Sequence, residues 1–350
     1  MLDELSSFII QEETSVFDAV AAIDRNRRQI IFVCDGMRLL GSLSDGDIRR
    51  YILRSGDVSK SVRHAANYNA VTLSKEEATN AQSLITKAPY IKAIPILDET
   101  GDIVSVYFSE SEYVRKDVNL SIPVVIMAGG KGARLKPFTN VLPKPLIPIG
   151  DMTITEHIME RFLNFGCTEF SIIINEKKEL IKAYFSETQC KGNLDFIDEE
   201  VFQGTAGGLK LIHGKLNSTF FLTNCDILVE ADYEDILEHH RKTGALITMV
   251  CAIKKISVPY GTIELDDDGK PAKFIEKPEY PLLTNTGLYV IEPAFLDIIP
   301  SDKPIHMTDL IQSLIDEGKS VGIYPISENQ WSDMGQPQEL DKMISQLEMR

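Results

Sequence analysis

The stretch that most constrains the fold runs from residue 122 to residue 145. A short apolar run over residues 122–128 meets a loop with three glycines, and basic residues follow. Residues 118–150 contain no Asp or Glu, although the chain has a formal net charge of -16. A buried strand that feeds a flexible loop with fixed cations is how a parallel α/β sheet presents a phosphate site. The sequence therefore predicts a phosphate-binding loop at the carboxyl end of a strand.

From residue 122 onward, segments typical of strands and of helices alternate. Strands are predicted at residues 122–128, 169–175, 220–226 and 246–253, and helices at residues 154–165, 179–185 and 233–242. This alternation favours a largely parallel sheet with helices on both faces. The expected fold class is α/β, with a Rossmann-like, mostly parallel sheet.

Residues 1–115 hold two copies of a smaller pattern. A helix, a strand and, after a turn, a returning strand are predicted at residues 16–23, 29–34 and 39–43. The same three elements are predicted again at residues 78–85, 93–97 and 103–107. This is an internal duplication of about 60 residues. The polar segment 115–121 separates it from the α/β pattern, so two domains are expected, at residues 1–117 and 122–350.

The duplicated unit resembles a pair of CBS (cystathionine-β-synthase) domains, an α+β fold. Residues 41–48, Gly-Ser-Leu-Ser-Asp-Gly-Asp-Ile, match the G-x-[VL]-[ST]-x-x-D element of that family. The resemblance implies that Ser44 and Asp47 bind the ribose of an adenine nucleotide as a regulatory site. The second copy has Ser109 but carries Glu112 where Asp is expected. The alternative is that Ser44 and Asp47 simply cap a helix, since caps use the same residue types.

The glycine loop does not match two common phosphate motifs. Residues 130–135 lack the third glycine of a dinucleotide fingerprint and the Gly-Lys-Ser/Thr of a Walker loop. A loop whose backbone N–H groups and Arg134 wrap a polyphosphate does fit, because glycines allow close approach and guanidinium matches phosphate oxygens.

The compound motif of residues 128–135 and 143–146 resembles the signature of sugar-1-phosphate nucleotidylyltransferases, which join an NTP to a sugar 1-phosphate and release pyrophosphate. The resemblance covers residues 122 to about 340, and residues 202–209 resemble the base-contacting loop. The residues that it implies for nucleotide binding are Ala128, Gly129, Gly130, Gly132, Gln203, Gly204, Thr205, Ala206 and Asn224.

The remaining motifs follow in the order of that family. Residues 276–278 resemble the E-K-P that meets the sugar phosphate, and residues 285–289 resemble the N-x-G segment that lines the sugar pocket. The implied residues for sugar-phosphate binding are Glu276, Lys277, Asn285 and Gly287. Residues 224–226 and 331–335 resemble the segments that supply two metal ligands, Asp226 and Asp333. Mg²⁺ suits a site with few carboxylates in which substrate phosphates supply other ligands.

The reaction is an in-line displacement at the α-phosphorus of the NTP. The sugar-phosphate oxygen is already nucleophilic near neutral pH, so the enzyme must chiefly hold two polyanions together and stabilise charge. We expect Arg134 at the β- and γ-phosphates, Lys144 at the α-phosphate and Lys277 at the sugar phosphate. With Asp226, these are the expected catalytic residues.

The base and the sugar are less constrained. Residues 204–207, Gly-Thr-Ala-Gly, look most like guanylyl-transferring members, although similar loops occur in cytidylyl- and uridylyl-transferring relatives. A CBS pair ahead of the transferase resembles glucosamine-1-phosphate guanylyltransferases of legionaminic acid synthesis. GTP and glucosamine 1-phosphate are therefore expected, with mannose or heptose 1-phosphate, or a catalytically dead nucleotide sensor, as alternatives.

Composition limits the partners. A pI near 4.9 argues against a nucleic-acid-binding face, and no apolar run reaches transmembrane length. Five scattered cysteines indicate free thiols in a reducing compartment. The first residues lack the basic start and apolar run of a signal peptide, so a cytoplasmic protein is expected. A homo-oligomer is expected by resemblance, because CBS pairs associate.

Overall fold

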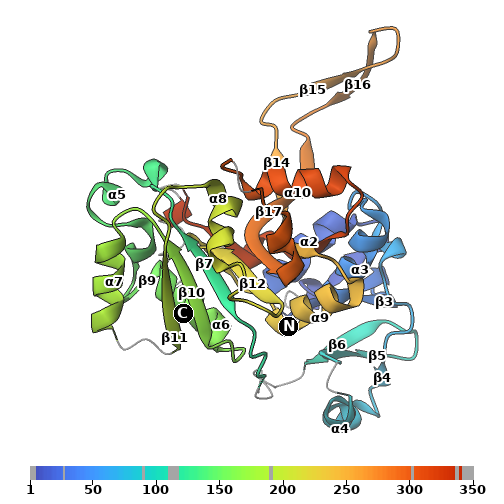
Figure 1. The fold of residues 1–350 in the computed structure, drawn as a ribbon. Coiled ribbons are helices and arrows are strands. Elements are labelled where there is room, and N and C mark those ends of the chain that lie inside the picture. Colours follow the sequence, from blue (N-terminus) through green and yellow to red (C-terminus); the bar gives the residue numbers. More distant parts are fainter. Residues whose placement is uncertain are drawn as a thin grey trace. The chain divides into compact units, whose positions relative to one another are not determined.

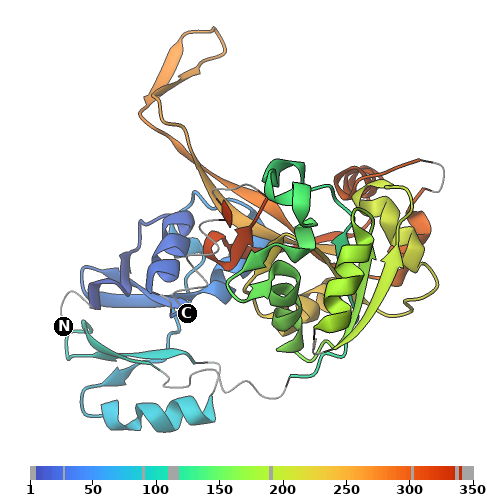
Figure 2. The same cartoon turned by 90° about the vertical axis from the view of Figure 1, so that its left-hand side faces the viewer.

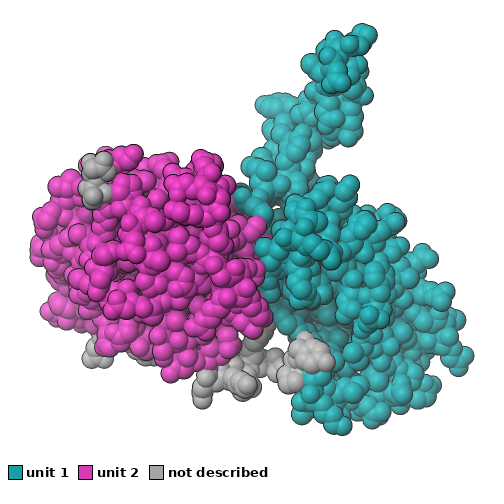
Figure 3. Space-filling model, turned by 45° about the vertical axis from the view of Figure 1, so that its right-hand side comes forward, with its two compact units in different colours: residues 1–114, 253–283 teal, residues 115–252, 284–350 magenta. Residues whose placement is uncertain are grey.

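The structure is a computed structural model that describes residues 5–26, 28–88, 91–108, 118–188, 192–300, 303–335 and 339–340. The chain divides into two compact units (Figure 3). Unit 1 comprises residues 1–114 and 253–283, and unit 2 comprises residues 115–252 and 284–350. Residues 253–283, which the expected division assigns to the second domain, thus group with the N-terminal unit.

A mostly parallel sheet forms the centre of unit 2 (Figure 1). In the part of the chain that the structure describes, seven strands follow the order β11-β10-β7-β12-β17-β14-β18. The first four are parallel, and β17 runs antiparallel to β12. The strands are β7 (Val124–Ala128), β10 (Glu169–Ile174), β11 (Asn193–Asp198), β12 (Phe220–Asn224), β14 (Ile247–Ser257), β17 (Glu279–Ile291) and β18 (Val321–Ser327).

Helices cover both faces of this sheet. Alternate residues of β7 point to opposite sides: Val124 and Ile126 join one core cluster, and Val125 and Met127 join the other. Buried side chains of α6 (Ile154–Leu163), α7 (Lys178–Glu187) and α9 (Tyr233–Thr243) belong to the first cluster. Those of η5 (Gly208–Ile212), η6 (Pro293–Ile298) and α10 (Met307–Asp316) belong to the second. Because both faces of β7 are buried, its sequence is a continuous apolar run.

Several shorter elements complete unit 2. Thr153 and Glu156 form a capping box at the start of α6, and Asp232 caps α9, which ends at Gly244 in the left-handed conformation. The short elements are η3 (Ala133–Leu135), α5 (Phe138–Val141), η4 (Lys144–Leu146), β8 (Pro148–Ile149), β9 (Met152–Thr153), α8 (Gly204–Gly207), β13 (Ile227–Val229), η7 (Glu328–Gln330) and β19 (Trp331–Asp333).

The N-terminal part of unit 1 shows the predicted duplication in its topology. The first repeat consists of β1 (Ile9–Gln11), α2 (Val16–Asn26), β2 (Ile30–Asp35), β3 (Arg38–Ser44), α3 (Asp45–Ser55) and η1 (Val62–His64). The second contains β4 (Leu73–Ser74), η2 (Ala78–Asn80), α4 (Ala81–Lys87), β5 (Ala93–Leu97) and β6 (Ile103–Phe108).

The two repeats also share their strand pairing. In each one the first strand pairs parallel to the second, and the second pairs antiparallel to the third. The register shifts at equivalent places, between Val33 and Cys34 in one repeat and between Ile96 and Leu97 in the other. Ser109 and Glu112 of the second copy lie outside the described residues.

Residues 253–283 form an arm that includes the last residues of β14 and the first residues of β17. Within it, β15 (Thr262–Leu265) and β16 (Pro271–Ile275) make a two-stranded antiparallel ribbon, drawn in orange in Figure 2. Ile263 lies opposite Phe274, and both are more than half exposed. The ribbon therefore has no hydrophobic core of its own, and the base of the arm supplies its contacts with the rest of unit 1.

The predicted fold class, α/β with a mostly parallel sheet behind an N-terminal CBS region, is confirmed. Four cysteines lie in the described part of the chain, and all are free and buried: Cys34 in unit 1, and Cys167, Cys225 and Cys251 in unit 2. Among the described helices, none is both long and apolar enough to cross a bilayer.

Candidate active site

The glycine loop leaves the carboxyl end of β7, as the sequence predicts. Ala128 is the buried last residue of the strand, and Gly132 has a φ of 61°. Thr139 Oγ1 donates to the carbonyl of Gly132 at 2.9 Å, and a Cβ on Gly132 would come within 2.7 Å of Thr139 Cγ2. Glycine is required there for both conformation and space. Gly130, by contrast, has open space around it.

Four of the predicted catalytic and metal residues come together in unit 2. Lys144 Nζ donates to the carboxylate of Asp226, and both side chains are nearly buried. Asp333 is close enough to Asp226 and Lys144 for their charges to affect its ionisation. Arg134 is exposed and lies beside Gly335, where a Cβ would be 3.4 Å from its guanidinium.

Short strands hold the two carboxylates near each other. Asp226 follows β12, and the next strand, β13, pairs antiparallel to β19 so that Ile227 lies opposite Asp333. The N–H of Met334 donates to the carbonyl of Asp226 at 2.8 Å. The N–H of Gly335 donates to Asp333 Oδ1 at 2.6 Å, which fixes the orientation of that carboxylate.

The electrostatics of Asp333 reflect this crowding. Burial and the negative charge of Asp226 raise the pKa of Asp333 above its usual range. The hydrogen bond from Gly335 and the charges of Lys144 and Arg134 act in the opposite direction. A carboxylate whose pKa is raised by a neighbouring carboxylate is a suitable place for an added cation.

The N-x-D and N-x-G motifs also meet. Because Thr223 pairs with Leu288 across β12 and β17, Asn224 lies beside Gly287. Gly287 has a φ of 90°, and a Cβ on it would come within 2.4 Å of Asn224 Nδ2. Asn285 Oδ1 accepts from the N–H of Gly287 at 3.1 Å, and its Nδ2 donates to the hydroxyl of Tyr289 at 2.8 Å. These three predicted site residues therefore lie together, next to Asp226.

The Gly-Thr-Ala-Gly loop is clamped by the segment before α10. The N–H groups of Ala206 and Gly207 donate to the carbonyl of Ile305, and the N–H of Ile305 donates to the carbonyl of Gln203. Thr205 Oγ1 accepts from the N–H of Met307 at 2.9 Å. Gly204 has a φ of 85°, and a Cβ there would be 2.3 Å from Ile305 O. The shape of the loop depends on this backbone packing, and the contact of its residues with the nucleotide base stays a prediction.

Glu199 is a residue that the sequence analysis missed. It follows β11 and is 2% exposed. Its Oε1 accepts from the N–H of Gln203 at 2.9 Å, whereas Oε2 has no hydrogen-bond partner among the described residues. A Cβ on Gly129 would be 2.8 Å from Oε2, so the free oxygen lies between the glycine loop and Gln203. Burial raises the pKa of Glu199. A buried carboxylate oxygen without a partner needs a donor, and a ligand can supply it.

The comparison with family models decides the assignment of this cluster. The model described as "Nucleotidyl transferase" matches residues 123–350, which include every one of these residues. The chain belongs to the nucleotidyl transferase family. A CBS domain model matches residues 5–54, which contain the first repeat of unit 1.

Curated relatives of this nucleotidyl transferase differ in base and sugar. It is 32% identical over 234 residues to a UTP–glucose-1-phosphate uridylyltransferase from Synechocystis sp., covering 60% of this chain and 59% of the relative. It is 33% identical over 228 residues to a mannose-1-phosphate guanyltransferase from Pichia angusta, covering 61% of each. The chain thus spans about three fifths of the length of the curated relatives that it matches.

A solved structure supports the fold. HddC from Yersinia pseudotuberculosis superimposes with a TM-score of 0.51 at 22% sequence identity, over 65% of this chain and 99% of that one. At this level of identity the likeness concerns the fold alone.

Nucleotidyl transferases of this family generally use a divalent metal ion. The donor set here fits one: Asp226 and Asp333 are adjacent carboxylates, and phosphate oxygens and water can complete an oxygen-rich shell. In the described residues, no group of three or more His, Cys, Asp or Glu side chains could form a fuller cage. Hard divalent cations that bind together with phosphates require few protein ligands.

Two predicted site regions lie in unit 1. Glu276 and Lys277 belong to the arm, and their binding of the sugar phosphate stays a prediction. Ser44 and Asp47 form the capping box of α3: Asp47 Oδ2 accepts from the N–H and Oγ of Ser44, at 2.9 and 2.6 Å. This is the geometry of the helix-cap alternative, and nucleotide binding by the two residues stays a prediction.

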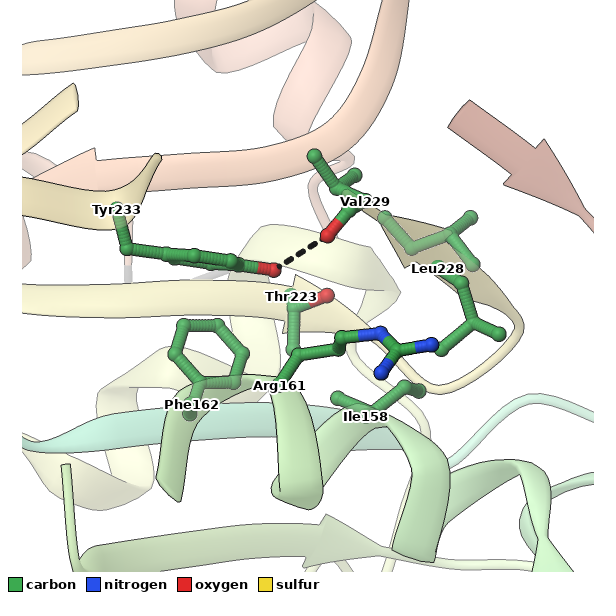
Figure 4. Close-up of a pocket in the computed structure, with 8 residues that line it drawn as sticks. Ile158, Arg161, Phe162, Thr223, Leu228, Val229 and Tyr233 are labelled. Atoms are coloured by element: carbon green, nitrogen blue, oxygen red, sulfur yellow. Dashed lines mark hydrogen bonds between the residues drawn. The ribbon is translucent and has the colours of Figure 1, made fainter. Parts of the chain in front are cut away.

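A small pocket lies between α6, β13 and the start of α9 (Figure 4). Ile158, Phe162 and Tyr233 help to line it, and the hydroxyl of Tyr233 donates to the carbonyl of Val229 at 2.9 Å. None of the predicted site residues lines this pocket, but the three residues of β13 do. The pocket is therefore distinct from the candidate active site, although it adjoins the strand that follows Asp226.

Proposed function

We propose that this chain catalyses transfer of a guanylyl group from GTP to a sugar 1-phosphate, with release of pyrophosphate. The observation that carries the proposal is the cluster of Arg134, Lys144, Asp226 and Asp333 at the carboxyl ends of β7 and β12. Cations for a polyphosphate and carboxylates for a metal lie within one site, beside a glycine loop.

The reaction follows from these charges. A phosphate oxygen of the sugar 1-phosphate attacks the α-phosphorus of GTP, and the bond from that phosphorus to the oxygen bridging to the β-phosphate breaks. Pyrophosphate leaves with the bonding electrons, and no proton transfer is needed at the attacking oxygen. Positioning and charge stabilisation therefore account for most of the catalysis.

Lys144 and Arg134 have separate roles in the proposal. Lys144 is paired with Asp226 in the structure, so a bound α-phosphate would compete for the same ammonium group. Arg134 is exposed at the edge of the site and can turn its guanidinium to the departing β- and γ-phosphates. A Mg²⁺ ion held by Asp226 and Asp333 would neutralise phosphate charge when bound.

Glu199 supports guanine as the base. The Watson–Crick edge of guanine presents two neighbouring donors, N1–H and the N2 amino group, and a carboxylate accepts from both. Uracil presents one donor between two carbonyl oxygens, which a buried carboxylate would repel. The free Oε2 of Glu199, between Gly129 and Gln203, therefore favours GTP over UTP.

The sugar is proposed from the resemblance. Glucosamine 1-phosphate, as used for legionaminic acid, is the first candidate, and mannose and heptose 1-phosphates are the alternatives. Asn285 and Gly287 would line its pocket, and Glu276 and Lys277 would meet its phosphate. An adenine nucleotide at the CBS repeats and assembly into a homo-oligomer also belong to this proposal.

A catalytically dead nucleotide sensor is the rival proposal. A sensor has no need to keep two carboxylates and a lysine at the attacked phosphorus. The near-burial of both Lys144 and Asp226, and the fixed orientation of Asp333, support the enzyme instead.

A pyrophosphate-release assay tests the proposal. Four NTPs are combined with a panel of sugar 1-phosphates in the presence of Mg²⁺, and the strongest signal is expected from GTP with glucosamine 1-phosphate. Asp226→Asn should lower kcat about 10²- to 10³-fold or more, by analogy with the loss of other charge-stabilising groups. Asp267→Asn, in the exposed turn of the arm, is the matched control and should leave kcat unchanged. Near-wild-type kcat in Asp226→Asn would refute the proposed role of this site.

The base assignment has its own test. Glu199→Gln replaces one acceptor oxygen with a donor amide, so it should lower kcat/KM for GTP by about 10- to 100-fold, the value of one or two hydrogen bonds to a charged group. The kcat/KM for UTP should fall less or rise. A parallel loss for both nucleotides would mean that Glu199 acts only through the shape of the loop.

A further inference from the structure

The base of the arm is built into the first CBS repeat. Ile253, the first residue of the arm, is 5% exposed and belongs to the hydrophobic core that contains Val16 and Ala19 of α2. Two residues later, Lys255 Nζ lies 5.2 Å from the centre of the Phe17 ring, at cation–π distance. The N–H of Phe17 donates to the carbonyl of Val58 at 2.9 Å, which fixes the start of α2.

Lys255 connects this helix to the other end of the arm. Its ammonium group also forms an ion pair with Glu279, the first residue of β17. Hydrogen bonding from Lys255 lowers the pKa of Glu279, and Ser257 Oγ donates to the same carboxylate at 3.3 Å. The N–H of Val258 donates to the carbonyl of Pro278 at 2.9 Å. The outgoing and returning chains of the arm are thus tied together immediately after Lys277.

Lys277 lies in the chain directly before these ties. It lies between β16 and β17 and has a φ of 46°, in the left-handed region that a lysine rarely adopts. Such a backbone persists only where the surroundings hold it in place. The hydrogen bond to Pro278 and the ion pair of Glu279 are the contacts next to it in the chain.

We infer that Phe17, Lys255 and Glu279 form a brace through which the first CBS repeat positions Lys277 for the sugar 1-phosphate. Phe17 and Lys255 are positioning residues in this scheme, and neither touches substrate. The inference rests on the proposed function, because it uses the role of Lys277 there. It goes beyond that function because it makes part of the CBS repeat a determinant of the affinity for the sugar 1-phosphate. This effect requires no nucleotide bound to the repeat.

Steady-state kinetics of the full-length protein test the brace. Phe17→Ala and Lys255→Met should each raise KM for the sugar 1-phosphate about three- to tenfold, as expected from an exposed ion pair plus a cation–π contact. The kcat and the KM for GTP should stay within about twofold. Lys255→Arg and Phe17→Tyr should restore the wild-type KM, since each keeps the interaction. Lys273→Met, on β16 opposite Glu264, is the control within the same arm.

Hydrogen–deuterium exchange gives a readout that does not depend on turnover. In Phe17→Ala and Lys255→Met, amides of residues 277–283 should exchange faster than in wild type and in Lys273→Met. Unchanged exchange there, or an unchanged KM for the sugar 1-phosphate in an active protein, would overturn the inference. Equal losses for both substrates would indicate a merely structural role and would also overturn it. A wild-type protein without any transfer activity, but with the expected exchange pattern, would instead refute the proposed function.

Discussion

At the scale of single residues, Asp45 of unit 1 is a carboxylate whose charged form is disfavoured by burial. It is the first residue of α3 and is half-buried, and its burial raises the pKa to about 6. The charge of Asp24 acts in the same direction, whereas Lys92 and Arg49 oppose it. The folded protein thus binds a proton at Asp45 more readily than the unfolded chain does, where the carboxyl has an ordinary pKa near 3.8.

This shift predicts how stability depends on pH. Between about pH 4 and pH 6 the folded state holds more protons at Asp45, so its contribution to stability falls as the pH rises and stays lost above pH 6. Asp45→Asn removes the charge and should increase the free energy of unfolding by about 1–2 kcal/mol at pH 7, a discounted figure because the group is partly solvated. The gain should vanish near pH 4. Thermal unfolding at pH 4, 5.5 and 7 measures this gain in the free energy of unfolding. Asp35→Asn, on the exposed end of β2, is the control.

Single residues also mark the limit of sequence-based prediction. Arg134, Lys144, Asp226 and Asp333 could be predicted because each sits in a short motif, and the structure brings these four together. Glu199 could not be found in that way. It becomes notable only when the end of β11 packs next to the glycine loop. The available signal was a carboxylate directly after a strand and four residues before Gln203.

At the scale of elements, local pattern predicted four strands of the central sheet, β7, β10, β12 and β14, but not β11, β17 or β18. Residues 93–97 and 103–107 agree with β5 and β6 within one residue, because apolar runs bounded by a turn define them. The prediction for β14 ended at residue 253, although the strand continues to Ser257. The continuous apolar run ends at Ile253, and the residues that follow in the strand are two lysines, Ile256 and Ser257, so no apolar run marks its end.

The arm is the element that sequence pattern describes least well. Thr262–Leu265 alternates polar and apolar residues, which normally indicates a half-buried strand. In the structure Ile263 and Leu265 are 57% and 62% exposed. The alternation therefore places the apolar side chains on one face of the ribbon without burying them. The pairing of β15 with β16 depends on the turn that joins them more than on a hydrophobic core.

At the scale of the whole molecule, the two units are interleaved along the chain. Unit 2 begins before the arm and resumes after it, so both ends of residues 253–283 are continuous with strands of the central sheet. A boundary drawn from sequence separates only consecutive segments, so the domain bounds 1–117 and 122–350 stay a prediction beside this grouping by contacts. The duplication in residues 1–115, by contrast, could be predicted, since its signal is repeated locally.

The buried cysteines have a consequence for labelling chemistry. Burial raises the pKa of Cys34 and Cys167 to about 11, and of Cys225 and Cys251 to about 12. At pH 8 less than roughly one part in 10³ of each thiol is ionised, and electrophiles react with the thiolate. Alkylation at these positions must therefore wait for local opening of the surrounding core.

Each thiol thus reports on the unit that encloses it. In iodoacetamide time courses resolved by mass spectrometry, Cys34 should label at the opening rate of unit 1, and Cys225 and Cys251 at that of unit 2. Mild denaturant should separate the two rates if the units open independently. Labelling of all four at the rate of a free thiol in native buffer would contradict their burial. The chain therefore carries intrinsic, site-specific reporters of unfolding in both units and requires no engineered cysteine.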